Sequence, residues 1–166
     1  MKNYPFIQNV SRRAIEVGDH YIGKNSYYIQ SSGSTHLDDT VLISINDPLQ
    51  QPPNPHYVFK DTRYFEFLDL EEADFSSADE FKIQYEQAEE IIKFLQESLE
   101  KGYNVIVHCT VGLCRSGAVA EVGVMMGFSD TGTYRQPNMM VKNYLLKVLD
   151  WKIVTEEDYS NIFKGG

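Results

Sequence analysis

Short runs of β-branched and aromatic residues alternate along the chain with longer stretches of helical periodicity. The segment Thr40–Asn46 (TVLISIN) is short, rich in β-branched residues and closed by Asp47-Pro48, which predicts a buried strand. A second strand is predicted at Arg63–Leu68 (RYFEFL), and a third at Tyr103–Val107. Each of the three is short enough to cross a sheet once, so we expect them to be the central strands of one sheet.

Three stretches with apolar residues on one face predict helices between and after these strands. The first has a capping box at Ser77-Ala78-Asp79-Glu80 as its expected start, and Gly102 suits the left-handed residue that ends a helix. Two shorter helices are expected at Ser116–Met126 and Asn138–Leu149, and a last one near Thr155–Phe163. The apolar face of the long helix is spaced three or four residues apart: Phe81, Tyr85, Ala88, Ile91, Ile92, Leu95 and Leu99.

The alternation of strand and helix predicts an α/β fold with a central, mostly parallel sheet flanked by helices. A length of 166 residues suits one domain with a single core, so residues 1–166 are expected to form one domain. Surface loops are expected at residues 50–55 (QQPPNP) and from Leu70 to Asp79. The first forty residues indicate only a strand at Tyr27–Ile29 and a loop at residues 31–39.

The charge balance narrows the range of partners. The net charge of −9, from 24 acidic and 15 basic residues, repels nucleic acid and anionic membranes, so we expect neither as a partner. No apolar run approaches the roughly 20 residues of a membrane span, and MKNYPFIQNV does not resemble a signal peptide. Both cysteines lie in one short stretch, which favours a reducing, cytoplasmic setting over a disulfide framework.

The candidate chemistry lies in VIVHCTVGLCRSG, residues 105–117, where a predicted strand turns into a predicted helix. We call residues 109–115 the Cys–Arg loop. A loop that leads into a helix N-terminus directs several backbone N–H groups to one point, which suits a tetrahedral dianion. Gly112 permits the positive φ of a tight reversal, and Arg115 can hold two phosphate oxygens at once.

The same surroundings favour a thiolate at Cys109, because helix N-termini and nearby cations stabilise it over the thiol. The residues therefore predict that the loop binds a phosphate and that Cys109 attacks its phosphorus. Ser116 is placed to donate a hydrogen bond to this thiolate, and His108 to orient the cysteine backbone. The remaining histidines, at positions 20, 36 and 56, lack metal-ligand spacing, so we predict neither a metal nor a cofactor.

The stretch HCTVGLCRS, residues 108–116, resembles the HCxxGxxR(S/T) phosphate-binding loop of cysteine-dependent protein tyrosine phosphatases. The flanking residues 40–150, including AVAEVGVMMG and YRQPNMMVKNYLLKVL, are similar to the small dual-specificity branch. This resemblance implies a dual-specificity-phosphatase-like fold, Cys109 as the nucleophile that forms a thiophosphate, and Arg115 as the ligand of phosphate and transition state. It also implies phosphate binding by Ser116 and by the rest of the loop: Thr110, Val111, Gly112, Leu113 and Cys114.

The family also needs an aspartic acid that protonates the leaving oxygen and then activates water. Asp69, directly after RYFEFL, fits best, ahead of Asp74 and Asp79. The Trp-Pro-Asp acid loop of the large tyrosine-specific domains does not occur here, so the resemblance leaves open the preference between phosphotyrosine and phosphoserine or phosphothreonine.

The loop and its surroundings also suggest a substrate class. Its variable positions 110, 111, 113 and 114 carry no positive charge, unlike those of related lipid and RNA phosphatases, so a singly phosphorylated protein is the expected substrate. Cys114 is either a redox partner of Cys109 or an apolar packing residue, and Asn138 either braces the loop or caps a helix. A phosphoprotein-binding domain without turnover and another thiol enzyme, such as a sulfurtransferase or arsenate reductase, remain alternatives.

Overall fold

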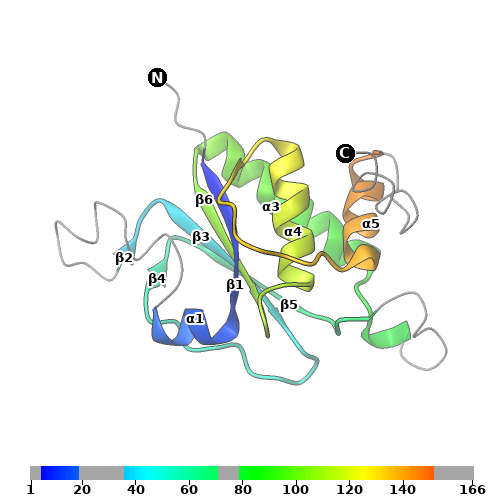
Figure 1. Ribbon diagram of the computed structural model, residues 1–166, viewed down its shortest axis with the longest axis horizontal. Helices are drawn as coiled ribbons and strands as arrows, with labels where there is room; N and C mark the ends of the chain where they lie inside the picture. The colour runs from blue at the N-terminus through cyan, green and yellow to red at the C-terminus, as the bar shows by residue number, and fades with distance from the viewer. Residues whose placement is uncertain (1–4, 19–35, 71–78, 152–166) are drawn as a thin grey trace.

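The computed structural model describes residues 5–18, 36–70 and 79–151 (Figure 1). The elements are β1 (Phe6–Ser11), α1 (Arg12–Val17), β2 (His36–Leu37), β3 (Thr40–Asn46), β4 (Val58–Phe59), β5 (Thr62–Glu66), the 3-10 turn η3 (Asp79–Phe81), α3 (Tyr85–Lys101), β6 (Asn104–Cys109), α4 (Arg115–Met126), β7 (Ser129–Asp130) and α5 (Met139–Val148). Within these ranges strands and helices alternate from α3 to α5, whereas β2, β3, β4 and β5 follow one another along the chain.

Five strands form the main sheet in the order β5-β3-β6-β1-β7, and β2 pairs with β4 separately. Every pairing between the described strands is parallel. β3 is buried along its whole length and β6 along nearly all of it, as expected of central parallel strands covered on both faces. The predicted α/β fold with a parallel sheet between helices is confirmed.

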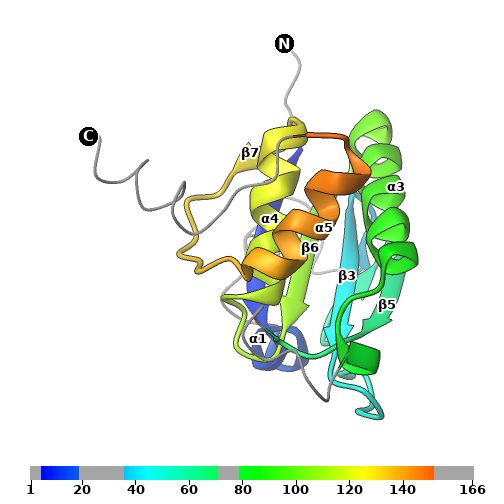
Figure 2. The same cartoon turned by 90° about the vertical axis from the view of Figure 1, so that its right-hand side faces the viewer.

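The sheet is covered differently on its two faces. Helices α3, α4 and α5 lie together on one face, with α5 against both of the others (Figure 2). The larger apolar cluster fills the space between these helices and the strands, around Ile43, Leu95, Val107 and Leu145. A smaller cluster on the other face joins α1 to the sheet through Ile15, Leu42 and Ile106. The two clusters hold β6 from both sides and thereby fix the position of the residues at its end.

The predicted start of the long helix is wrong. The helix begins at Tyr85, with Gln84 as its N-cap and a capping box made by Gln84 and Gln87, and the residues around Phe81 form a separate 3-10 turn. Phe81 and Tyr85 accordingly remain partly exposed. Glutamine is a weak N-cap signal in sequence, whereas the serine-led box upstream matched the usual pattern. The end of the helix is as predicted, because Gly102 adopts φ 75°.

Other differences concern the N-terminal part of the chain. Strand β1 and helix α1 were not predicted, because buried polar residues interrupt the apolar pattern of β1. His36–Leu37 forms a short strand within the expected loop at residues 31–39. The strand expected at Tyr27–Ile29 and the helix expected near Thr155–Phe163 lie outside the described residues.

Within the described ranges, no helix is long and apolar enough to cross a membrane.

Candidate active site

The Cys–Arg loop connects the middle strand of the sheet to a helix. Cys109 is the last residue of β6, and Arg115 is the first residue of α4. β6 lies between β3 and β1, so the ends of both neighbouring strands flank the loop. The loop thus occupies the carboxyl edge of a parallel sheet, where ligands bind in open α/β folds.

The sulfur of Cys109 is buried and lies against polar groups of the Cys–Arg loop and of Ser116 in α4. Only 3% of the residue is exposed. The backbone N–H of Gly112 donates to the sulfur at 3.3 Å, and Ser116 Oγ lies 3.1 Å from it. Cys109 and Cys114 form no disulfide, and Cys114 is only half-buried. The sulfur thus accepts one backbone hydrogen bond from the loop and lies within hydrogen-bond distance of the Ser116 hydroxyl.

Four carbonyl groups of the Cys–Arg loop accept hydrogen bonds from residues outside the loop. Because the N–H and C=O of one planar trans peptide point in opposite directions, an outward carbonyl directs the next residue's N–H toward the interior of the loop. This orientation applies to the N–H groups of residues 111, 113, 114 and 115. The outer bonds are Arg12 N to Thr110 O (3.1 Å), Asn9 Nδ2 to Gly112 O (2.7 Å), Gln136 N to Leu113 O (3.0 Å) and Asn138 N to Cys114 O (2.9 Å).

Gly112 is required by the close approach of β1. Its φ is 89°, in the left-handed region that favours glycine. A Cβ at this position would overlap the backbone of Val10 and Ser11 at the end of β1. The glycine therefore permits both the reversal of the loop and its contact with the neighbouring strand.

The guanidinium of Arg115 lies within the protein at the same edge of the sheet. The residue is 5% exposed, and its Nη2 donates to Thr110 Oγ1 at 3.1 Å. Nη1 donates to Asp47 Oδ1 at 2.7 Å and to the carbonyl of Phe67 at 2.8 Å. Nε is buried and finds no hydrogen-bond partner among the described residues. An oriented, buried guanidinium with an unused donor is suited to binding an oxyanion.

Asp47 was missed by the sequence reasoning, although a signal existed. It directly follows the predicted strand Thr40–Asn46 and so had to lie at the carboxyl edge, beside the Cys–Arg loop. In its ion pair with Arg115, the guanidinium side is buried, whereas the side chain of Asp47 is 42% exposed. Asp47 and Phe67 O together fix the orientation of the guanidinium.

His108 is buried behind Cys109 in a chain of polar groups. Burial lowers its pKa to about 4 from the ordinary 6.5, against the raising effect of its hydrogen bond to the Cys109 carbonyl. A neutral ring must donate to that carbonyl from Nδ1 (3.1 Å) and accept from Ser44 Oγ at Nε2 (2.6 Å). Ser44 Oγ accepts from Asn46 Nδ2, and Asn46 Oδ1 accepts from Arg12. The hydrogen bond to the Cys109 carbonyl is a contact through which His108 could orient the cysteine backbone, as the sequence predicts.

Asp69 lies after β5 on the surface, and Asn138 connects it to the Cys–Arg loop. Asn138 Nδ2 donates to Asp69 Oδ1 at 2.6 Å and to the carbonyl of Leu70 at 2.9 Å. Its Oδ1 accepts from Val141 N and caps α5, while its backbone N–H donates to Cys114 O. Asn138 therefore fills both roles that the sequence left open. Asp74 lies outside the described residues, as does the side chain of Asp79.

The predicted binding residues differ in exposure. Thr110 and Val111 are exposed, with Val111 at 67%, whereas Gly112 and Ser116 are buried. Leu113 and Cys114 are intermediate, and Arg115 is the one cationic residue among these positions. Within the described part of the chain, no three histidine, cysteine or acidic side chains lie close enough to hold a metal ion.

Comparisons with known proteins add little to this geometry. No protein-family model and no curated protein matches the sequence. One solved structure with a similar fold is the crystal structure of Tk-PTP in the active form, which is 16% identical over 99% of this chain and 91% of that chain, with a TM-score of 0.41. So distant a likeness says nothing about chemistry, which must be inferred from the side chains themselves.

Proposed function

We propose that this protein is a phosphatase that hydrolyses phosphomonoesters through a cysteinyl-phosphate intermediate. The observation that carries the proposal is the buried Cys109 sulfur, which accepts from Gly112 N–H and lies 3.1 Å from Ser116 Oγ, in the same loop as a buried guanidinium. The outward carbonyls of this loop support an interior lined with N–H groups. Together these features suit a nucleophile beneath a bound oxyanion.

In the first step, the thiolate of Cys109 attacks phosphorus and forms the S–P bond while the P–O ester bond breaks. Asp69, as the carboxylic acid, donates its proton to the leaving oxygen. Arg115 and the loop N–H groups bind the three non-bridging oxygens, on which the charge is spread in the transition state. The hydrogen bond from Asn138 to Asp69 supports this assignment, because it connects the acid to the Cys–Arg loop.

In the second step, water attacks phosphorus and the S–P bond breaks, which releases inorganic phosphate. The Asp69 carboxylate accepts a proton from the water, and the Ser116 hydroxyl stabilises the departing thiolate by its hydrogen bond. His108 stays neutral throughout and holds the Cys109 carbonyl. The cycle requires neither a metal nor a cofactor.

The proposed substrates are phosphorylated proteins, with phosphotyrosine foremost and phosphoserine or phosphothreonine as further candidates. The exposed positions of the loop, Thr110 and Val111, are uncharged, which fits a substrate with one phosphate. The net charge of −9 disfavours highly anionic substrates such as RNA. These features support the dual-specificity type of phosphatase.

The test is hydrolysis of an aryl phosphate at mildly acidic pH by the purified full chain. We expect turnover that is abolished in Cys109→Ser and Arg115→Ala, and competitive inhibition by orthovanadate. Asp69→Asn should lower kcat steeply if Asp69 is the acid. Oxyanion binding without turnover would instead identify a phosphoprotein-binding domain, and turnover that vanadate does not inhibit would point to sulfur chemistry.

A further inference from the structure

Asn9 is a buried polar residue in the middle of β1 that the proposed reaction does not use. Only 2% of it is exposed. Its Nδ2 donates to Gly112 O at 2.7 Å and to Tyr134 O at 3.0 Å, while its Oδ1 is buried with no partner in the described part of the chain. Burying an amide with one end unpaired costs stability that an apolar strand residue would not cost. The position therefore calls for an explanation other than packing.

The orientation of the amide is fixed by its neighbours. An amide NH₂ group has two protons, and here two carbonyl oxygens accept them. The reversed orientation would set Oδ1 against both oxygens, so only the present one is stable. Asn9 thus donates to two segments, each more than a hundred residues away from it in sequence.

The first of these two bonds acts on the Cys–Arg loop. Among its four outward carbonyls, Gly112 O is the one held by a side chain, whereas the other three accept from backbone N–H groups. The peptide that contains Gly112 O also contains the N–H of Leu113, so the bond from Asn9 directs that N–H toward the interior of the loop. Removing the side chain would release this peptide and leave its neighbours in place.

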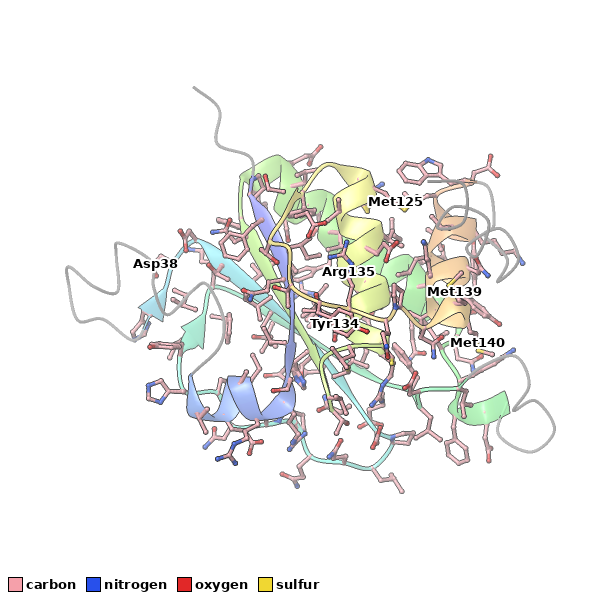
Figure 3. All side chains as sticks on the ribbon, viewed as in Figure 1. Asp38, Met125, Tyr134, Arg135, Met139 and Met140 are labelled. Atoms are coloured by element: carbon pink, nitrogen blue, oxygen red, sulfur yellow. The ribbon has the colours of Figure 1, made fainter. Side chains whose placement is uncertain are left out.

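The second bond acts on the segment of residues 131–138, which follows β7 and leads into α5. Figure 3 shows Tyr134 and Arg135 along this segment. Arg135 anchors it by hydrogen bonds of 3.1 and 3.2 Å to Asp130 and an ion pair of 3.5 Å with Glu121. The same segment ends in Asn138, which holds Asp69. Asn9 therefore bonds both to the Cys–Arg loop and to the segment that holds the proposed acid.

We propose that Asn9 is a positioning residue for oxyanion binding, which fixes the Gly112–Leu113 peptide and joins the Cys–Arg loop to residues 131–138. Its effect on turnover rests on the proposed phosphatase function, whereas its effect on oxyanion affinity does not. This difference allows the two proposals to be tested separately.

The chain offers a matched control for this test. Asn104, at the opposite end of the same strand pair, accepts a hydrogen bond from Phe6 N at 3.0 Å. Asn104→Ala thus also removes a side-chain bond between β1 and β6, but far from the Cys–Arg loop. Both variants are compared with the wild type by urea unfolding, orthovanadate titration in a calorimeter and aryl phosphate kinetics.

We expect Asn9→Ala to bind orthovanadate about tenfold more weakly and Asn104→Ala to stay within about twofold of wild type, because only the first leaves a loop peptide unheld. Asn9→Ser keeps one donor, should fall between Asn9→Ala and wild type, and replaces Asn9→Ala if that variant does not fold. If Asn9→Ala and Asn104→Ala have the same vanadate affinity, Asn9 is only structural and the inference is wrong.

The outcomes separate the two proposals. A wild type that binds vanadate without hydrolysing aryl phosphate contradicts the proposed function alone, and Asn9 is then judged by affinity. A wild type that binds no oxyanion overturns both. Intact activity in the wild type together with unchanged affinity in Asn9→Ala overturns the inference alone.

Discussion

Gly112→Ala provides a strict test of how closely β1 approaches the Cys–Arg loop. An alanine at φ 89° costs about 1–2 kcal/mol for the left-handed backbone alone. Its Cβ would also overlap the backbone of Val10 and Ser11, and an overlap with strand backbone costs a further 1–3 kcal/mol or so. The expected loss is therefore about 2–5 kcal/mol, unless the loop moves away from β1. Movement of the loop would displace the N–H groups and weaken orthovanadate binding.

Gly102→Ala is the matched control, because Gly102 has a similar φ of 75° but, among the described residues, no atom beyond its own chain neighbours lies within 4 Å of an added Cβ. We expect it to lose only the backbone cost, about 1–2 kcal/mol, with unchanged vanadate affinity. Urea unfolding measures the free energies, and calorimetric titration measures the affinities. Equal destabilisation of the two variants, with wild-type vanadate binding in Gly112→Ala, would refute the account of the loop given above.

Three further predictions concern the polar groups around the loop. His108 becomes protonated near pH 6.5 in the unfolded chain but only near pH 4 in the folded chain. The free energy of unfolding should therefore fall by about 3 kcal/mol as the pH drops from 6.5 to 4. Urea unfolding of His108→Gln should lack this pH-dependent loss. Asp47→Ala should cost about 1–2 kcal/mol in urea unfolding and raise KM for an aryl phosphate, because it frees the guanidinium of Arg115; an unchanged KM would contradict this role. Asn138→Ser keeps a helix cap but cannot donate to Asp69 as an amide does, so kcat should fall with little change in unfolding free energy, whereas equal effects on both would indicate capping alone.

The sequence predicted those features of the fold that depend on local patterns. The strand at Thr40–Asn46 was predicted with its observed bounds, because a continuous β-branched run ended by Asp-Pro has few other interpretations. The Cys–Arg loop was placed between strand and helix for a similar reason. The start of α3 was not predicted, because its cap is Gln84, a residue that caps only through the reciprocal bond with Gln87.

The residues that surround the loop are set by tertiary contacts, and no local pattern reveals them. Asn9 and Asn46 look like ordinary polar interruptions in the sequence, yet both are buried and hydrogen-bonded near the Cys–Arg loop. Asp47 could have been predicted from the order of parallel strands, whereas the place of β1 beside β6 could not, since β1 itself was not recognised. The motif thus predicted the candidate chemistry, but not the surrounding residues that hold the loop in place.

The insertion of β1 between β6 and β7 has a consequence for synthesis on the ribosome. Strand β1 cannot find either of its sheet neighbours until more than ninety further residues have been translated. A nascent chain that stops before residue 104 therefore carries β1 with its edges unpaired, a state prone to aggregation.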